Sequence, residues 1–151
     1  MQDFRNLSVW QMARRFTKSV YELTVNYPGS EEFGLKAQMR RASVSICSNI
    51  AEGCGRRGDR DFRRFLDVAM GSACELECET ILSFDLAFIT EAVQDEMLAV
   101  ILEIKKLLGG LISTLTAAIA RRSQSATPAS RGGGTPTSGR RPGSGGVTQS
   151  S

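Results

Sequence analysis

Hydrophobic residues recur at helical spacing in four segments of this chain, at about residues 7–27, 34–53, 59–88 and 90–122. Within each segment, apolar residues stand three or four positions apart and polar or charged residues fill many of the remaining positions. This spacing places the apolar residues on one face of a helix. Because the connections between segments are short, consecutive helices are expected to lie antiparallel. The pattern therefore predicts an all-α fold, an antiparallel up-down-up-down four-helix bundle.

Turn and capping residues mark the ends of these helices. A Pro-Gly-Ser turn at 28–30 ends the first segment, and a Gly-Cys-Gly turn at 53–55 ends the second. Asp59 and Thr90 are expected to be the N-caps of the third and fourth helices, because their side chains can accept hydrogen bonds from free backbone N–H groups. Gly109 and Gly110 cost the fourth helix about 1 kcal/mol each relative to alanine, which favours a close approach of another backbone there.

The apolar band of the fourth segment is wider than one seam of a bundle requires. Ile81 and Phe84 add further apolar surface on the third segment. Apolar surface that a single bundle leaves uncovered favours a second interface, so we expect a homo-oligomer. A thicker core within one chain is the alternative.

The composition changes after residue 122, and with it the expected organisation. Residues 123–151 are rich in Gly, Ser, Thr, Pro and Arg, so we predict a disordered tail after a single bundle domain of residues 1–122. The domain holds 16 basic and 16 acidic residues, but residues 65–104 contain nine acidic and no basic ones. A neutral domain argues against a uniformly basic surface, although a local cluster can still bind phosphates.

Such a cluster of arginines is expected around the connection between the second and third helices. Arginine suits bidentate contacts to phosphate and stacking on unpaired bases, which favours RNA or DNA as the ligand. The same side chains suit salt bridges to acidic residues of a neighbouring subunit or another protein, which would make the chain an interaction scaffold. The seven arginines are Arg40, Arg41, Arg56, Arg57, Arg60, Arg63 and Arg64.

Asn49 and Glu52 place an amide and a carboxylate on or beside the apolar stripe of the second segment. A polar group in a packed interior costs roughly 1–3 kcal/mol unless it finds a hydrogen-bond partner. We therefore interpret the two side chains as a structural polar clamp, bonded to another helix, a helix end or a second subunit.

The absence of histidine from the whole chain excludes several classes of enzyme. Histidine-dependent triads, histidine metal ligands and the Glu-x-x-His pairs of di-iron bundles are all impossible. The four cysteines lack the closely spaced knuckles of a zinc site, and packing in the core is their expected role. No glycine-rich phosphate loop is present. We predict no catalytic residue, no metal and no cofactor, and hence a protein that is not an enzyme.

The sequence also bears on the compartment. Its first residues lack the basic flank and apolar run of an export signal. The longest apolar stretch, residues 98–119, is broken by Glu103, Lys105 and Lys106, short of a membrane span. Four cysteines without such a signal fit a reducing environment. We expect a cytoplasmic protein without a membrane partner.

Several short motifs occur in one order along residues 2–120. They are DFRNL at 3–7, VWQ at 9–11, FGL at 33–35, QMRRA at 38–42, SNIAEG at 48–53, FL at 65–66, GS at 71–72 and ELE at 75–77. Together they resemble the 23S rRNA-intervening-sequence family of four-helix bundles. The resemblance implies a ring-shaped homo-oligomer, a pentamer, related to accessory proteins of diversity-generating retroelements. Those proteins act with a reverse transcriptase and bind nucleic acid through basic surfaces, so the implied partners are RNA or DNA and a reverse transcriptase or another protein.

Overall fold

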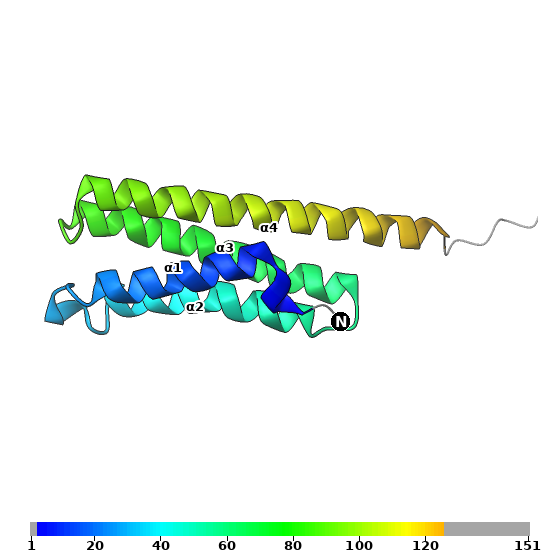
Figure 1. The fold of residues 1–151 in the computed structure, drawn as a ribbon, viewed down its shortest axis with the longest axis horizontal. Coiled ribbons are helices and arrows are strands. Elements are labelled where there is room, and N and C mark those ends of the chain that lie inside the picture. Colours follow the sequence, from blue (N-terminus) through cyan, green and yellow to red (C-terminus); the bar gives the residue numbers. More distant parts are fainter. Residues whose placement is uncertain (1–2, 126–151) are drawn as a thin grey trace, which may run out of the picture.

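The computed structural model describes residues 3–125, which form four α-helices and two short 3₁₀ helices (Figure 1). Successive α-helices run antiparallel along one long axis, which confirms the predicted all-α four-helix fold. Helix α2 packs most extensively on α3, and α1 makes only a small contact with α4. The elements are η1 (Phe4–Asn6), α1 (Ser8–Thr24), η2 (Gly29–Glu31), α2 (Leu35–Cys54), α3 (Asp59–Asp85) and α4 (Glu91–Ser125).

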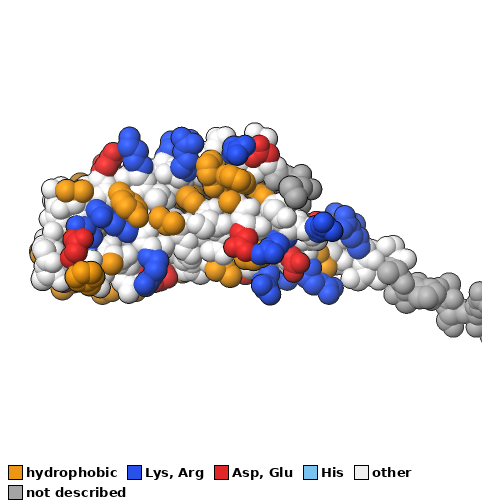
Figure 2. All heavy atoms as spheres, turned by 90° about the horizontal axis from the view of Figure 1, so that it is seen from below, with side chains coloured by type: hydrophobic (Ala, Val, Ile, Leu, Met, Phe, Trp, Pro, Cys, Tyr) orange, Lys and Arg blue, Asp and Glu red, His pale blue; other side chains and the backbone are white. Residues whose placement is uncertain are grey.

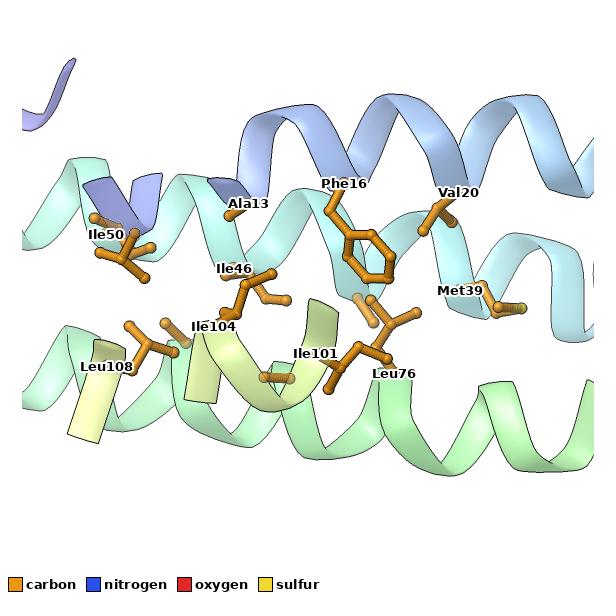
Figure 3. Close-up of a cluster of buried hydrophobic side chains, with 14 of the residues drawn as sticks. Ala13, Phe16, Val20, Met39, Ile46, Ile50, Leu76, Ile101, Ile104 and Leu108 are labelled. Carbon is orange, nitrogen blue, oxygen red and sulfur yellow. The ribbon is translucent and has the colours of Figure 1, made fainter. Parts of the chain in front are cut away.

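The core runs along the bundle axis and is built from the predicted apolar stripes (Figure 3). Phe16 of α1, Ile46 of α2 and Ile104 of α4 converge there. In segment 59–88, apolar spacing of three and four positions predicts one buried face, and every residue of that face is buried because it faces both α2 and α4. These α3 residues are Phe62, Leu66, Ala69, Ala73, Leu76 and Thr80.

The ends of α3 differ from the prediction. Gly58, not Asp59, occupies the N-cap position, and Asp59 is the first helical residue. At the other end α3 stops at Asp85 instead of continuing to Phe88. Ala87 adopts a φ of 59°, and the Phe88 N–H donates to the Ser83 carbonyl at 2.8 Å. Glycine usually occupies this left-handed position after a helix. Because alanine stands here, the sequence gives no signal for the end of α3.

Helix α4 begins as predicted and continues past the expected end of the domain. The Thr90 hydroxyl accepts a hydrogen bond from the Val93 N–H at 3.3 Å, which confirms the cap. The helix reaches Ser125, so residues 123–125 are helical, whereas the rest of the predicted tail, 126–151, lies outside the described residues. At Gly109 and Gly110 an added Cβ would meet no atom of residues 3–125 within 4 Å. The predicted close approach of another backbone is therefore wrong within this chain.

Apolar surface remains uncovered on α3 and α4. The side chains of Ile81 and Phe84 are exposed, with exposed fractions of 42% and 38%. On α4 only Met97, Ile101 and Ile104 with Leu108 are buried, because α1 is half as long as α4 and does not reach along it. The apolar residues of the C-terminal half of α4 stay half-buried; they are Leu111, Ile112, Leu115 and Ile119. In the part of the chain that the structure describes, no helix has the length and apolar character of a membrane span.

Candidate nucleic-acid interface

Helices α2 and α3 meet at a hairpin whose close packing depends on Gly53. A Cβ added at Gly53 would lie 2.7 Å from the Phe62 ring and 3.0 Å from the Phe65 Cβ. Only a residue without a side chain lets the two helices approach this closely. The contact fixes the start of α3 against the end of α2, and so determines where the arginines at 56–64 lie.

Two of these arginines form cation–π contacts with the ring of Phe65. The guanidinium of Arg56 lies 4.9 Å from the centroid of the Phe65 ring, and that of Arg64 lies 5.6 Å from it. Arg56 also forms an ion pair with Glu52, one turn earlier. Cation–π contacts leave N–H donors free, so Arg64 keeps its full charge for a ligand.

Arg57 and Arg60 are the hairpin arginines without a partner. Both are exposed, and neither side chain forms an ion pair or a hydrogen bond within residues 3–125. Arg63, in contrast, pairs with Asp67 at 3.8 Å. Among the described residues, the hairpin therefore offers two guanidinium groups without any partner, one that stacks on Phe65 without an acidic partner, and two that are paired with carboxylates.

Helix α4 brings further arginines to the same end of the bundle. Arg122 forms an ion pair with Asp59 at 3.3 Å, which ties α4 to the start of α3. A cavity of about 320 Å³ lies between these helices and is lined by Arg60, Arg122 and Ile119, among others. Figure 2 shows Lys and Arg side chains at this end of the molecule and also along the rest of the visible face. Our sequence prediction did not include Arg121 and Arg122, although the four basic residues without an acidic one in 105–122 were the available signal.

Two of the seven predicted arginines lie elsewhere. Arg40 and Arg41 are 14 and 13 positions before Cys54, the last residue of α2, which is about 20 Å along the helix. Arg40 donates to the Thr24 hydroxyl at 2.8 Å and to the Tyr21 carbonyl at 3.2 Å, so it joins α2 to the end of α1. The prediction that all seven surround one hairpin is wrong, because Arg40 and Arg41 lie in the first half of α2 and the other five follow the end of that helix.

The two members of the predicted polar clamp have different surroundings and different partners. Asn49 is half-buried and donates to the Ser45 carbonyl at 2.8 Å and to the Ser45 hydroxyl at 3.1 Å. That hydroxyl is 2.8 Å from the Ser72 hydroxyl of α3, so the amide connects to the next helix through one side chain. Glu52 is exposed and bonds to Arg56, so its expected burial is wrong.

A different carboxylate is the buried one. Glu79 of α3 is only 6% exposed, and its Oε2 has no hydrogen-bond partner among the described residues. Burial and the neighbouring Glu75 raise the pKa of Glu79 from 4.5 to about 7, against the opposing effect of Arg41. Glu79 stands between the predicted positions of the stripe, so its burial could not be distinguished from that of an ordinary surface glutamate.

The four cysteines are free thiols in two environments. Cys54 is buried and Cys47 is half-buried, and burial raises the pKa of both thiols. Cys74 and Cys78 are exposed, so the prediction of core packing is wrong for these two. Within residues 3–125, no three side chains of the metal-binding types lie close enough together to hold an ion.

Comparisons with known proteins agree with this architecture. A search of curated proteins finds no significant match. Among solved structures, a protein of unknown function from the S23 ribosomal protein family of Bacteroides thetaiotaomicron VPI-5482 has 28% sequence identity and a TM-score of 0.63. The match covers 69% of this chain and 97% of that one. The family model of the 23S rRNA-intervening sequence protein matches residues 5–110. Motifs, fold and family model agree, and the chain belongs to the 23S rRNA-intervening sequence protein family.

Proposed function

We propose that this protein is a non-enzymatic homo-oligomer that binds the backbone of RNA or DNA through the hairpin end of its bundle. The observation that carries the proposal is the pair Arg57 and Arg60, two exposed guanidinium groups that no acidic residue of 3–125 neutralises. Arg122 of α4 lines one cavity together with Arg60, and Arg64 follows Arg60 by four positions on α3. Guanidinium groups in this exposed arrangement can each contact a phosphate.

Assembly would supply the affinity that one subunit lacks. A few phosphate contacts per subunit give weak binding, but several copies acting on one strand raise the effective affinity by orders of magnitude. The uncovered apolar surface of α3 and α4 supports the oligomer. The family resemblance supports a pentameric ring. The free, exposed thiols of Cys74 and Cys78 fit a reducing compartment, and we place this function in the cytoplasm.

The test measures binding to single-stranded RNA and DNA by fluorescence anisotropy, at salt concentrations between about 50 and 200 mM. The variant R57S/R60S removes the two unneutralised charges. The control K18S/K106S removes two exposed charges away from the hairpin, of which Lys18 is paired with Glu22 at 3.6 Å. We expect the hairpin variant to bind more weakly, with a slope of log affinity against log salt reduced by about 0.7 for each lost contact. The control should behave as the unchanged protein. Binding that ignores salt, or that falls equally in both variants, would contradict the proposal.

A scaffold is the second candidate, and the ion pairs of the hairpin favour it. Arg56, Arg63 and Arg122 already bind carboxylates, so this surface has the chemistry of a protein contact. The acidic partner in that case is a neighbouring subunit, a reverse transcriptase or another protein. Light scattering on R57S/R60S separates the two candidates. Dissociation into monomers means that the arginines hold subunits together, whereas intact oligomers that no longer bind nucleic acid mean that the arginines bind the strand.

A further inference from the structure

A second basic site lies beside the first half of α1, outside the seven arginines considered so far. It is a cavity of about 310 Å³, near the lower end of the volumes typical of small-ligand sites. Three of its lining residues carry guanidinium groups, one carries an amide, and the last is the only tryptophan of the chain. The lining residues are Arg5, Trp10, Gln11, Arg14 and Arg15.

The indole of Trp10 is held in place from two sides. The Phe4 ring meets it edge-on, with ring centroids 4.8 Å apart and an interplanar angle of 67°. The Arg14 guanidinium lies 5.8 Å from the Trp10 centroid. Gln11 donates from Nε2 to the Arg5 carbonyl at 2.8 Å, which ties η1 to α1 and closes one wall. The aromatic surface is therefore preorganised and only half-buried.

The charges around this cavity are nearly all positive. Arg14 and Arg15 are exposed, and their side chains form no ion pair within residues 3–125. Arg5 pairs with Asp3 at 3.7 Å. Helix α1 begins without a side-chain cap and without an acidic residue in its first turn, so its positive end is not offset there. A ligand for this site should combine an anionic group with a flat ring.

We propose that the cavity binds a single unpaired nucleotide, with its base against Trp10 and its phosphate on Arg14 and Arg15. An aromatic ring can stack on a base that is not in a duplex. Two neighbouring guanidinium groups can donate hydrogen bonds to a phosphate. The volume suits one nucleotide better than a longer segment. The nucleotide can belong to a strand or be free in solution, and the two sources share this chemistry.

The cavity is placed to act with the hairpin. Element η1 contacts α2, and the end of α2 leads directly into the hairpin. One strand could therefore place a base in the cavity and its adjoining phosphates on Arg57 and Arg60. In this form the inference rests on the proposed nucleic-acid function and adds a preference for single-stranded nucleic acid.

The single tryptophan makes the test specific, because its emission reports this cavity alone. The full chain is titrated with a short single-stranded oligonucleotide, the same strand made abasic, the corresponding duplex and a free nucleoside 5′-monophosphate. We expect saturable quenching of Trp10 by the strand, quenching about tenfold weaker by the abasic strand, and none by the duplex. Quenching by the monophosphate would assign a free nucleotide as a second source of the same ligand.

Two variants separate this inference from the proposed function. R14Q/R15Q should lower the affinity measured by quenching about tenfold while helix content stays unchanged, because both side chains are exposed. R57Q/R60Q should leave quenching by the monophosphate unchanged and weaken only strand binding measured by anisotropy. Strand binding without any change in Trp10 emission would overturn the nucleotide cavity and leave the hairpin proposal standing. Quenching by the monophosphate without any binding of the strand would overturn the hairpin proposal and leave the nucleotide cavity standing. Equal quenching by the abasic strand, or by an acidic peptide, would also overturn the cavity assignment.

Discussion

At the residue scale, the Glu79 carboxyl group stands out, because it is buried without a partner for Oε2 among residues 3–125. Burial disfavours its charged form, and the Glu75 carboxylate on the exposed side of α3 adds repulsion. The facing Arg41 of α2, which bonds to Gln38, offsets only part of this effect. The fold therefore favours the protonated, uncharged form of the Glu79 carboxyl group.

The raised pKa of Glu79 predicts a stability that falls as pH rises. Below pH 4.5 the carboxyl group is protonated in both the folded and the unfolded protein, so it costs nothing. Between pH 4.5 and about 7 the unfolded state loses its proton first, and the cost to the folded state grows. Above pH 7 the cost is complete, at roughly 3 kcal/mol.

The variant E79Q, measured by urea unfolding at about pH 5 and 8, tests this prediction. We expect E79Q to be more stable than the unchanged protein at pH 8, by roughly 1–3 kcal/mol, with little difference at pH 5. E75Q is the matched control, since it removes the like charge and keeps the buried carboxyl, so it should give only a fraction of the gain. A variant E79Q that loses stability at pH 8 would mean that the carboxylate is bound to a partner in the native protein.

At the element scale, glycines on two helices have opposite roles. Gly53 lies under Phe62 and Phe65, where a Cβ has no room, whereas Gly110 lies on the exposed side of α4, where a Cβ meets nothing within 4 Å in residues 3–125. We predict that G53A destabilises the protein by about 1–3 kcal/mol through overpacking of the α2–α3 contact. G110A should stabilise it by up to about 1 kcal/mol, because alanine favours the helix.

Thermal or urea unfolding of both variants measures these effects. G109A is a second variant of the same kind as G110A, since it too has open space. A loss of stability in G110A together with a loss of oligomer mass would mean that another subunit packs against this part of α4. A neutral G53A would contradict the close α2–α3 contact.

The helices were predictable from sequence because the apolar spacing directly encodes which face of each helix is buried. The stripe of α3 from Phe62 to Thr80 is buried at every predicted position. Position along the axis is not encoded in this way. Arg40 lies in the first half of α2, whereas Arg56 follows the C-terminal end of that helix. The Trp10 cavity was missed for a related reason, since residues 5 and 15 meet only when η1 folds back against α1.

Across the whole molecule, charge is unevenly distributed along the bundle axis. Arg57, Arg60 and Arg122 lie at the hairpin end. Seven of the nine acidic residues in 65–104 lie within residues 75–96, which surround the α3–α4 connection at the opposite end. In a ring of parallel subunits the arginines of all copies would share one face. Such a face would bind phosphates and repel neighbouring copies, so salt should weaken strand binding while it favours assembly.

The C-terminal half of α4 is the surface that we expect to join subunits. Helix α4 has 35 residues and α1 has 17, so the second half of α4 lacks a cover from α1 within the described chain. Ile112 and Ile119 lie there, seven positions apart on one face, and each is only half-buried. If this face joins subunits, replacing both residues by serine removes apolar area from the interface and leaves most of the core intact.

We therefore expect the unchanged protein to be an oligomer at micromolar concentration by light scattering, and I112S/I119S to be largely monomeric with its helix content retained. The variant F33S is the control, because Phe33 is 96% exposed and precedes α2, away from this part of α4. It should keep the mass of the unchanged protein. If the unchanged protein is already monomeric, or if the double variant keeps the oligomer mass, then this face of α4 does not join subunits. Because strand binding in our proposal depends on several copies, the monomeric variant should also lose affinity for nucleic acid while Arg57 and Arg60 remain in place.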